Sequence, residues 1–173
     1  MNGKRFYFNL ALIVGIIWAL DQITKFFIRA HVHPYKIYSI IPGLFNIIYV
    51  QNRGAIFGLF ANTSHHFRTP FFYAVTIGAI FIIFALLFAM EEHQWLTKLG
   101  MTLILGGALG NFTDRVCFGQ VTDFLDFYIG RHHWPAFNVA DSAITIGIFV
   151  VLIDTFRDMF RNKEETPNVT LSN

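Results

Sequence analysis

The chain has 173 residues, of which 54% are hydrophobic, 17% aromatic and only 14% charged, and its formal net charge is +2. Soluble domains carry about 25% charged residues, so the composition excludes an ordinary soluble protein and predicts one compact integral membrane domain. The Lys and Arg residues are scattered, which excludes a basic nucleic-acid-binding patch. Cys117 is the only cysteine; it has no intrachain disulfide partner, and we expect a small packing residue.

Four apolar segments are long enough to cross a bilayer core of about 30 Å, which takes roughly 20 helical residues. We predict transmembrane helices over about residues 6–28, 71–90, 96–115 and 139–160. The first segment follows the basic start "MNGKR" but lacks a small-residue cleavage site, so we predict a retained span rather than a signal peptide. Pro70 precedes the second segment, where a helix start tolerates proline.

The connection between the first two spans, residues 31–69, is long and rich in polar and aromatic residues. Within it, "LFNIIYV" at 44–50 is typical of a strand, and "IPGL" before it predicts a turn. The glycines of "GAIFGLF" at 54–60 favour a mobile flap or a short amphipathic helix. We therefore expect a small surface sheet and a flap within 31–69. The polar tail, 162–173, predicts disorder.

Four spans place both termini on the same side of the membrane. Nearly equal numbers of Lys and Arg lie on the two sides, so the positive-inside rule discriminates weakly. Only the basic residues packed close to the chain ends favour a cytoplasmic side for the termini. The unusual polar residues gather on the opposite face, and this asymmetry indicates a functional site there.

Two motifs place polar residues on helix faces near that site. In "DQITK", Asp21 and Lys25 are four residues apart on a helix and can pair; the pair either anchors the helix at the interface or supports a site. In "GGALGNFTDR", Gly107, Asn111 and Asp114 share one stripe. Close helix packing explains the glycines but not the polar residues of the next turn, so we predict a functional role for Asn111.

Two later motifs supply carboxylates. "VTDFLDF" carries Asp123 and Asp126, and "FNVADSA" carries Asn138 and Asp141 one helical turn apart. Asp141 is alternatively a helix-start acid favoured by the macrodipole. Two acids at one site can share a proton, because repulsion and burial keep one of them neutral, and the ionised partner can then activate water. From the residues alone, Asp114, Asp123 and Asp126 remain equal candidates.

Other catalytic classes have little support in the sequence. It contains no G-x-S-x-G nucleophile motif. The histidines lack an H-E-x-x-H pattern or cysteine partners, so we expect neither a metal nor another cofactor.

Five motifs in order, "DQITK", "NRGAIF", "GGALGNFTDR", "VTDFLDF" and "FNVADSA", closely resemble those of lipoprotein signal peptidase, also called signal peptidase II, over about residues 21–145. The resemblance implies an intramembrane aspartic endopeptidase of the bacterial inner membrane, inhibited by globomycin. Such enzymes cut prolipoproteins just before a cysteine that carries diacylglycerol. The family fold, four transmembrane helices with a β-cradle and a flap on the outer face, agrees with the elements predicted above.

The resemblance implies that Asp123 and Asp141 are the catalytic aspartates. By the same resemblance, further residues match family positions near the two aspartates: Asp21, Lys25, Asn52, Gly54, Gly107, Asn111, Arg115 and Asn138. Two residues depart from the family pattern: Ile56 stands where a small residue is usual, and Thr122 where an aliphatic one is common. Neither removes a reacting group, but Ile56 puts substrate preference in question.

We therefore predict an all-α membrane protein with a small β-cradle, monomeric, with its site on the periplasmic face. Asp123 and Asp141 share one proton and bracket a water molecule, which attacks the carbonyl before the lipidated cysteine. The expected partners are diacylglyceryl-prolipoprotein and membrane lipid. A small proton-coupled transporter and a non-catalytic lipoprotein-binding protein are the alternatives; the lack of an internal repeat argues against the transporter.

Overall fold

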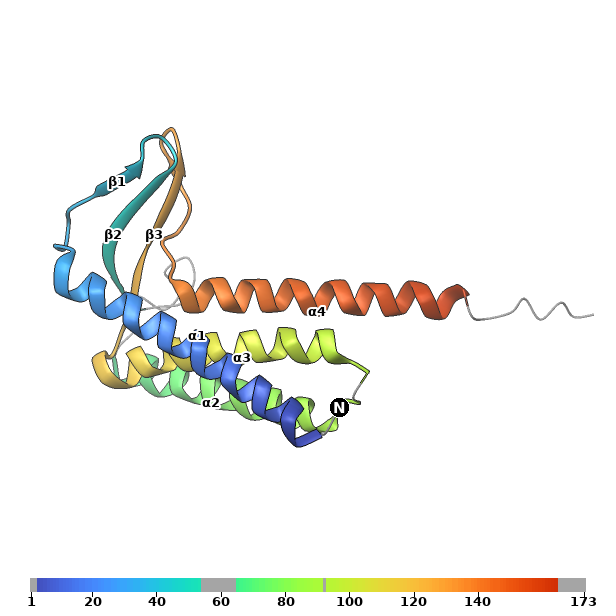
Figure 1. Cartoon of the computed structure of the whole chain (residues 1–173). Helices are drawn as coiled ribbons and strands as arrows, with labels where there is room; N and C mark the ends of the chain where they lie inside the picture. Colours follow the sequence, from blue (N-terminus) through green and yellow to red (C-terminus); the bar gives the residue numbers. More distant parts are fainter. Residues whose placement is uncertain (1–2, 54–64, 92, 165–173) are drawn as a thin grey trace, which may run out of the picture.

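The computed structural model describes residues 3–53, 65–91 and 93–164. The expected flap at 54–60, with Gly54 and Ile56, lies outside the described residues, as does most of the tail at 162–173. The elements in chain order are α1 (Gly3–His31), β1 (Tyr38–Ile41), β2 (Phe45–Asn52), α2 (His65–Ala89), α3 (Trp95–Phe118), β3 (Val121–Ile129), β4 (His132–His133) and α4 (Val139–Glu164). The protein is thus mostly helical, with a small sheet that stands at one end of the helices and projects to one side of them (Figure 1).

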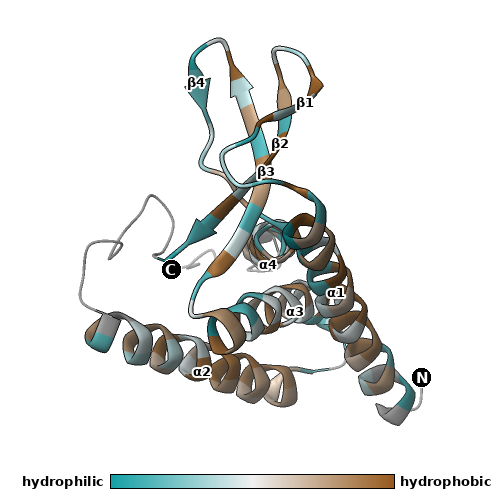
Figure 2. Cartoon of the chain, turned by 90° about the vertical axis from the view of Figure 1, so that its left-hand side faces the viewer, coloured by the Kyte–Doolittle hydropathy of each residue, from teal (hydrophilic) through white to brown (hydrophobic). Residues whose placement is uncertain are grey.

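Three helices in the described part of the chain are long and apolar enough to cross a membrane. These segments are Tyr7–His31, Thr69–Ala89 and Val139–Arg161. Large apolar side chains such as Phe26, Phe81 and Ile153 are exposed on them, and α1 and much of α2 are coloured as hydrophobic in Figure 2. The outward display of apolar side chains fits a lipid environment, in which they need no protein cover.

The fourth expected span corresponds to α3, which is not among the three helices found long and apolar enough to cross a membrane. Its 24 residues extend over about 36 Å at 1.5 Å per residue, and it packs against α1, α2 and α4. Several of its polar residues are buried in these contacts, including Lys98, Thr102, Asn111 and Asp114. Neighbouring helices, rather than lipid, therefore cover much of α3.

One helix boundary differs from the prediction. Helix α2 begins at His65, so Pro70 lies inside the helix and not at its start. Pro70 is the sixth residue of α2, so its missing N–H removes the hydrogen bond to the carbonyl of His66 near the start of the helix. The apolar pattern, which starts at Phe71, therefore marked where the apolar part of the helix begins rather than its first turn.

The sheet is antiparallel, with strand order β1-β2-β3-β4. The strand predicted from "LFNIIYV" is confirmed as β2. The motif "VTDFLDF", which lies between the segments predicted as spans at 96–115 and 139–160, forms a second strand, β3, with Asp123 opposite Val50 and Asp126 opposite Asn46. Most of β3 is buried on both faces, so its sequence lacks the alternation of apolar and polar residues that identifies a half-buried strand.

Candidate active site

The head of α4 is held against α1 and α3 by close backbone contacts. The Asp21 carboxylate on α1 accepts the N–H of Ala140 at 2.9 Å. A Cβ added to Gly107 on α3 would lie 2.3 Å from the carbonyl oxygen of Ala140. Glycine is therefore required at position 107 for α3 and α4 to approach this closely.

Asn138 and Asp141 cap the first turn of α4. The Asn138 side chain accepts the N–H of Asp141 at 2.9 Å, and the Asp141 carboxylate accepts the N–H of Asn138 at 3.3 Å. Such reciprocal bonds form a capping box, which satisfies backbone donors that the helix leaves unpaired. Asp141 therefore has the helix-start role that the sequence left open, but this role uses only one of its two oxygens.

Asp123 is held by an asparagine on each carboxylate oxygen. Its side chain is only 2% exposed. Asn138 donates to Oδ1 at 2.7 Å, and Asn52, the last residue of β2, donates to Oδ2 at 2.9 Å. These two bonds fix the orientation of the carboxyl group on β3.

The two aspartates are connected through Asn138 and Asn111. Asn138 bonds both of them, and its amide also donates to Oδ1 of Asn111 at 3.2 Å. Asn111 in turn donates to Asp141 Oδ1 at 2.8 Å. Residues from β3, α3 and α4 thus form one hydrogen-bonded unit.

The electrostatics of Asp123 agree with this proximity. The pKa of Asp123 is raised to about 7, first by burial and then by repulsion from Asp141; hydrogen bonds from Asn52 and Asn138 and the charge of Lys25 oppose the rise. A carboxyl group with this pKa is partly protonated at neutral pH. The pair can therefore carry one proton between them, which acid–base chemistry on water requires.

Lys25 supplies a buried positive charge next to the hydrogen-bonded unit of Asp123, Asn138, Asn111 and Asp141, which it contacts through Asn111. Its ammonium lies 2.8 Å from Asp21 and 3.4 Å from Asp114, and it donates to Asn111 Oδ1 at 3.0 Å. The side chains of Lys25, Asp21 and Asp114 are fully buried. The Asp21–Lys25 pair therefore lies inside the bundle rather than at the lipid surface.

Arg115 lies beside the unit without an ion pair to either aspartate among the described contacts. Its guanidinium stacks on Phe72 at 4.9 Å and approaches the carbonyl of Asn111 at 3.5 Å. It interacts electrostatically with both Asp123 and Asp141. Its charge therefore stabilises an ionised carboxylate at this site.

Asp114 and Asp126, the other candidate acids, have separate partners. Asp114 accepts the N–H of Thr122 at 2.9 Å and is approached by Arg29 at 3.3 Å, so it fixes the backbone next to Asp123. Asp126 binds Asn46 and His133, each at 2.8 Å. Sequence reasoning gave no role to Arg29, although it lies one turn beyond Lys25.

The Thr122 hydroxyl, unusual at its position, accepts a hydrogen bond from Arg29 at 3.1 Å.

Within the described ranges, no group of three or more His, Cys, Asp or Glu residues could hold a metal ion.

The family model for signal peptidase (SPase) II matches residues 13–157. The chain belongs to the signal peptidase II family. The lipoprotein signal peptidase of Syntrophus aciditrophicus (strain SB) is 43% identical over 143 residues, 83% of this chain and 89% of its own. That of Maridesulfovibrio salexigens is 42% identical over 152 residues, 88% of this chain and 97% of its own. The predicted family is thereby confirmed, and the chain is a signal peptidase.

The fold has a similar solved counterpart. A bacterial membrane enzyme determined by the in meso method at 2.3 Å resolution aligns with a TM-score of 0.78 and 33% identity, covering 92% of this chain and 93% of that one. Together with the three apolar helices, this likeness identifies a multi-pass membrane protein. The transporter and non-catalytic alternatives are not supported.

Proposed function

We propose that this signal peptidase II removes the signal peptide from diacylglyceryl-modified prolipoproteins, cutting just before the lipidated cysteine, and that Asp123 and Asp141 are its catalytic residues. The observation that carries the proposal is the shared binding of both carboxylates by Asn138. This arrangement fits an aspartic peptidase, in which one carboxyl group is neutral and the other ionised.

The reaction begins with a water molecule between the two carboxyl groups. The ionised aspartate takes a proton from this water, whose oxygen attacks the carbonyl carbon of the residue before the cysteine. The protonated aspartate gives its proton to the carbonyl oxygen, which produces a tetrahedral intermediate. When this intermediate collapses, the peptide C–N bond breaks, the amine leaves with the proton that the first aspartate took from water, and the second aspartate recovers its own proton. Asn52, Asn111 and Asn138 hold the carboxyl groups in place, so little reorganisation is needed during the reaction.

The membrane arrangement is part of the same proposal. We take α3 as the fourth span, so both termini lie on one side of the membrane. We assign this side to the cytoplasm from the basic residues near the chain ends, and the sheet and the site then lie at the periplasmic face of the inner membrane. The acyl chains of the substrate then lie in the bilayer among the helices and fix the depth of the scissile bond. Globomycin-type peptides bind the same site in a monomeric enzyme, with no metal or cofactor.

Asp123→Asn and Asp141→Asn test the catalytic assignment. Each should lower cleavage of a purified lipidated precursor by at least about 10³-fold, because positioned acid–base groups contribute roughly 10²–10⁴-fold and both act in one step. The matched control is Asp158→Asn, a partly exposed aspartate near the far end of α4 that pairs only with Arg161 among the described contacts; this variant should cleave normally. Near-normal turnover by either dyad variant would refute the two-aspartate mechanism.

A further inference from the structure

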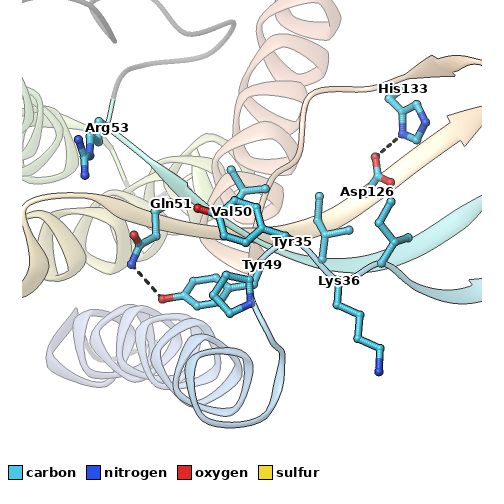
Figure 3. A pocket seen from close by; sticks show the side chains of 11 residues that line it. Tyr35, Lys36, Tyr49, Val50, Gln51, Arg53, Asp126 and His133 are labelled. Atoms are coloured by element: carbon cyan, nitrogen blue, oxygen red, sulfur yellow. Dashed lines mark hydrogen bonds and ion pairs between the residues drawn. The ribbon is translucent and has the colours of Figure 1, made fainter.

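A groove lies along the edge of β2 that faces β1, in the part of β2 that β1 does not pair with. Its volume is about 680 Å³, within the 300–1,000 Å³ range of ligand sites. One wall is β2 from Ile48 to Gln51, and the opposite wall is the connection 34–37 between α1 and β1. Arg53 lies at one end and the Asp126–His133 pair at the other (Figure 3).

The groove exists because β1 pairs with only part of β2. The last partners are Tyr38 and Ile47. Before Tyr38 the chain makes a turn in which Lys36 N–H bonds the carbonyl of His33 at 3.2 Å, and Tyr35 has φ +70°. Positive φ is unfavourable for an aromatic residue. The connection therefore adopts a tight turn at Tyr35 and does not continue β1 along β2.

The backbone of β2 presents hydrogen-bonding groups to this groove. Thr122, opposite Gln51, gives its N–H to Asp114 instead of to β2. In an antiparallel ladder, the N–H and C=O of a residue that does not bond its opposite partner point to the other edge. The N–H and C=O of Gln51 therefore face the groove. No backbone partner for Ile48–Gln51 occurs on that edge among the described residues.

We infer that this edge of β2 binds the mature segment of the precursor, the residues that follow the lipidated cysteine, as an added β-strand. The inference rests on the proposed function. A strand added to an open sheet edge gains main-chain hydrogen bonds, which do not depend on its sequence. A main-chain site of this kind suits precursors whose mature segments differ.

The position of the groove determines which part of the substrate reaches it. Val50 faces Asp123 across the ladder, so a strand in the groove lies two strand spacings, about 10 Å, from the catalytic strand. An extended peptide covers this distance in about three residues. One wall of the groove, residues 34–37, directly follows His31, where the apolar span of α1 ends. The groove therefore fits the segment that leaves the membrane and not the apolar signal peptide.

Backbone N-methylation of the substrate tests the inference directly. Lipidated precursors each carry one N-methyl residue at successive positions from about two to seven after the cysteine, and kcat/KM is measured with the purified full-length enzyme. We expect a loss of about fivefold or more where an N–H faces β2, with adjacent positions tolerant. A uniform response along the segment would overturn the inference.

The matching change in the enzyme is Gln51→Pro, which removes the backbone donor facing the groove and no bond between β2 and β3. The measured quantity is the ratio of kcat/KM for a long precursor to that for one ending just after the cysteine. Wild type and Gln51→Ala, which keeps the N–H, should prefer the long precursor by about fivefold or more. Gln51→Pro should lose this preference.

The two hypotheses fail in different ways. If wild type cleaves both precursors with equal kcat/KM, or if Gln51→Pro keeps the preference, the strand-addition site is refuted while the peptidase assignment stands. If wild type cleaves neither lipidated precursor, the proposed function itself fails.

Discussion

Asn138 links the stability of α4 to the geometry of the site. Its side-chain oxygen caps the helix through the N–H of Asp141, and its amide nitrogen donates to Asp123. The two functions use different ends of one side chain. They can therefore be separated by a residue that caps a helix but has no amide.

Asn138→Ser should separate them. Serine is a good cap and alanine is not, and replacing a cap by alanine costs about 1 kcal/mol. Asn138→Ser should thus be about 1 kcal/mol more stable than Asn138→Ala in detergent unfolding experiments. Both variants should lose about 10–100-fold in kcat, because each lacks a hydrogen bond to a charged group, which contributes about 1.5–3 kcal/mol. Normal kcat in Asn138→Ser would contradict a positioning role for the amide.

Asn52→Ala should change the pH dependence of cleavage. Asp123, with a pKa of about 7, holds its proton below this pH and loses it above, so the activity of a pair that needs one proton should fall on the alkaline side. The Asn52 hydrogen bond favours the ionised carboxylate. Its removal raises the pKa of Asp123, and the alkaline limb of the kcat/KM profile should move to higher pH.

Asn46→Ala is the control for this experiment. Asn46 lies on the same strand but bonds Asp126, so its loss should leave the position of the alkaline limb unchanged. A limb that moves to lower pH in Asn52→Ala would contradict the assignment of the limb to Asp123.

At the scale of elements, α3 is the organising helix of the site. It packs against the other three helices and carries the residues that connect them: Gly107 beside α4, Asn111 between Lys25 and Asp141, and Asp114 at the start of β3. The function of α3 therefore depends on its close approach to α4.

Gly107→Ala should disrupt this approach. The added methyl group would clash with the Ala140 carbonyl oxygen and would lie 2.8 Å from Ile144 Cγ1. Relieving the clash requires a shift of the α4 backbone, which disturbs the packing of α3 against α4. We expect a destabilisation of about 1–3 kcal/mol together with loss of cleavage, because Asp141 follows Ala140. The control is Gly78→Ala on α2, where nothing lies within 4 Å; it should keep full activity. Equal stability of the two variants would contradict the tight α3–α4 contact.

At the scale of the whole molecule, the number of spans decides where the site faces. If α3 crosses the membrane, Glu91 before it and Arg131 in the turn after β3 lie on opposite sides. If only the three apolar helices cross, the two residues lie on the same side. Both are exposed, and the chain has a single native cysteine, so both are convenient labelling positions.

Cysteine labelling distinguishes the two topologies. In a Cys117→Ser background, Arg131→Cys should react with a membrane-impermeant maleimide in spheroplasts, and Glu91→Cys only after permeabilisation. Labelling of both without permeabilisation would contradict four spans.

The sequence by itself determined the family, the three apolar helices that qualify as membrane spans, the strand at β2 and nearly all the polar residues that meet at the site. Helical periodicity placed Asp21 with Lys25, and Gly107 with Asn111 and Asp114, because these relations are local. Helix boundaries follow less directly from the sequence: α2 begins before Pro70. The helix expected at 96–115 is present as α3, but it is not among the three apolar helices that qualify as membrane spans.

Only the tertiary structure decided which acids share a partner. "VTDFLDF" carries no local signal that separates Asp123 from Asp126, since the difference arises from pairing with β2 and from Asn138, which follows 15 residues later in the chain. The open edge beside Gln51 was likewise invisible in the sequence, because it depends on where β1 stops pairing and where Thr122 donates its N–H. Helical periodicity depends on residues that are close together in the sequence, whereas shared hydrogen-bond partners and unpaired strand edges result from contacts between segments that are far apart in the sequence.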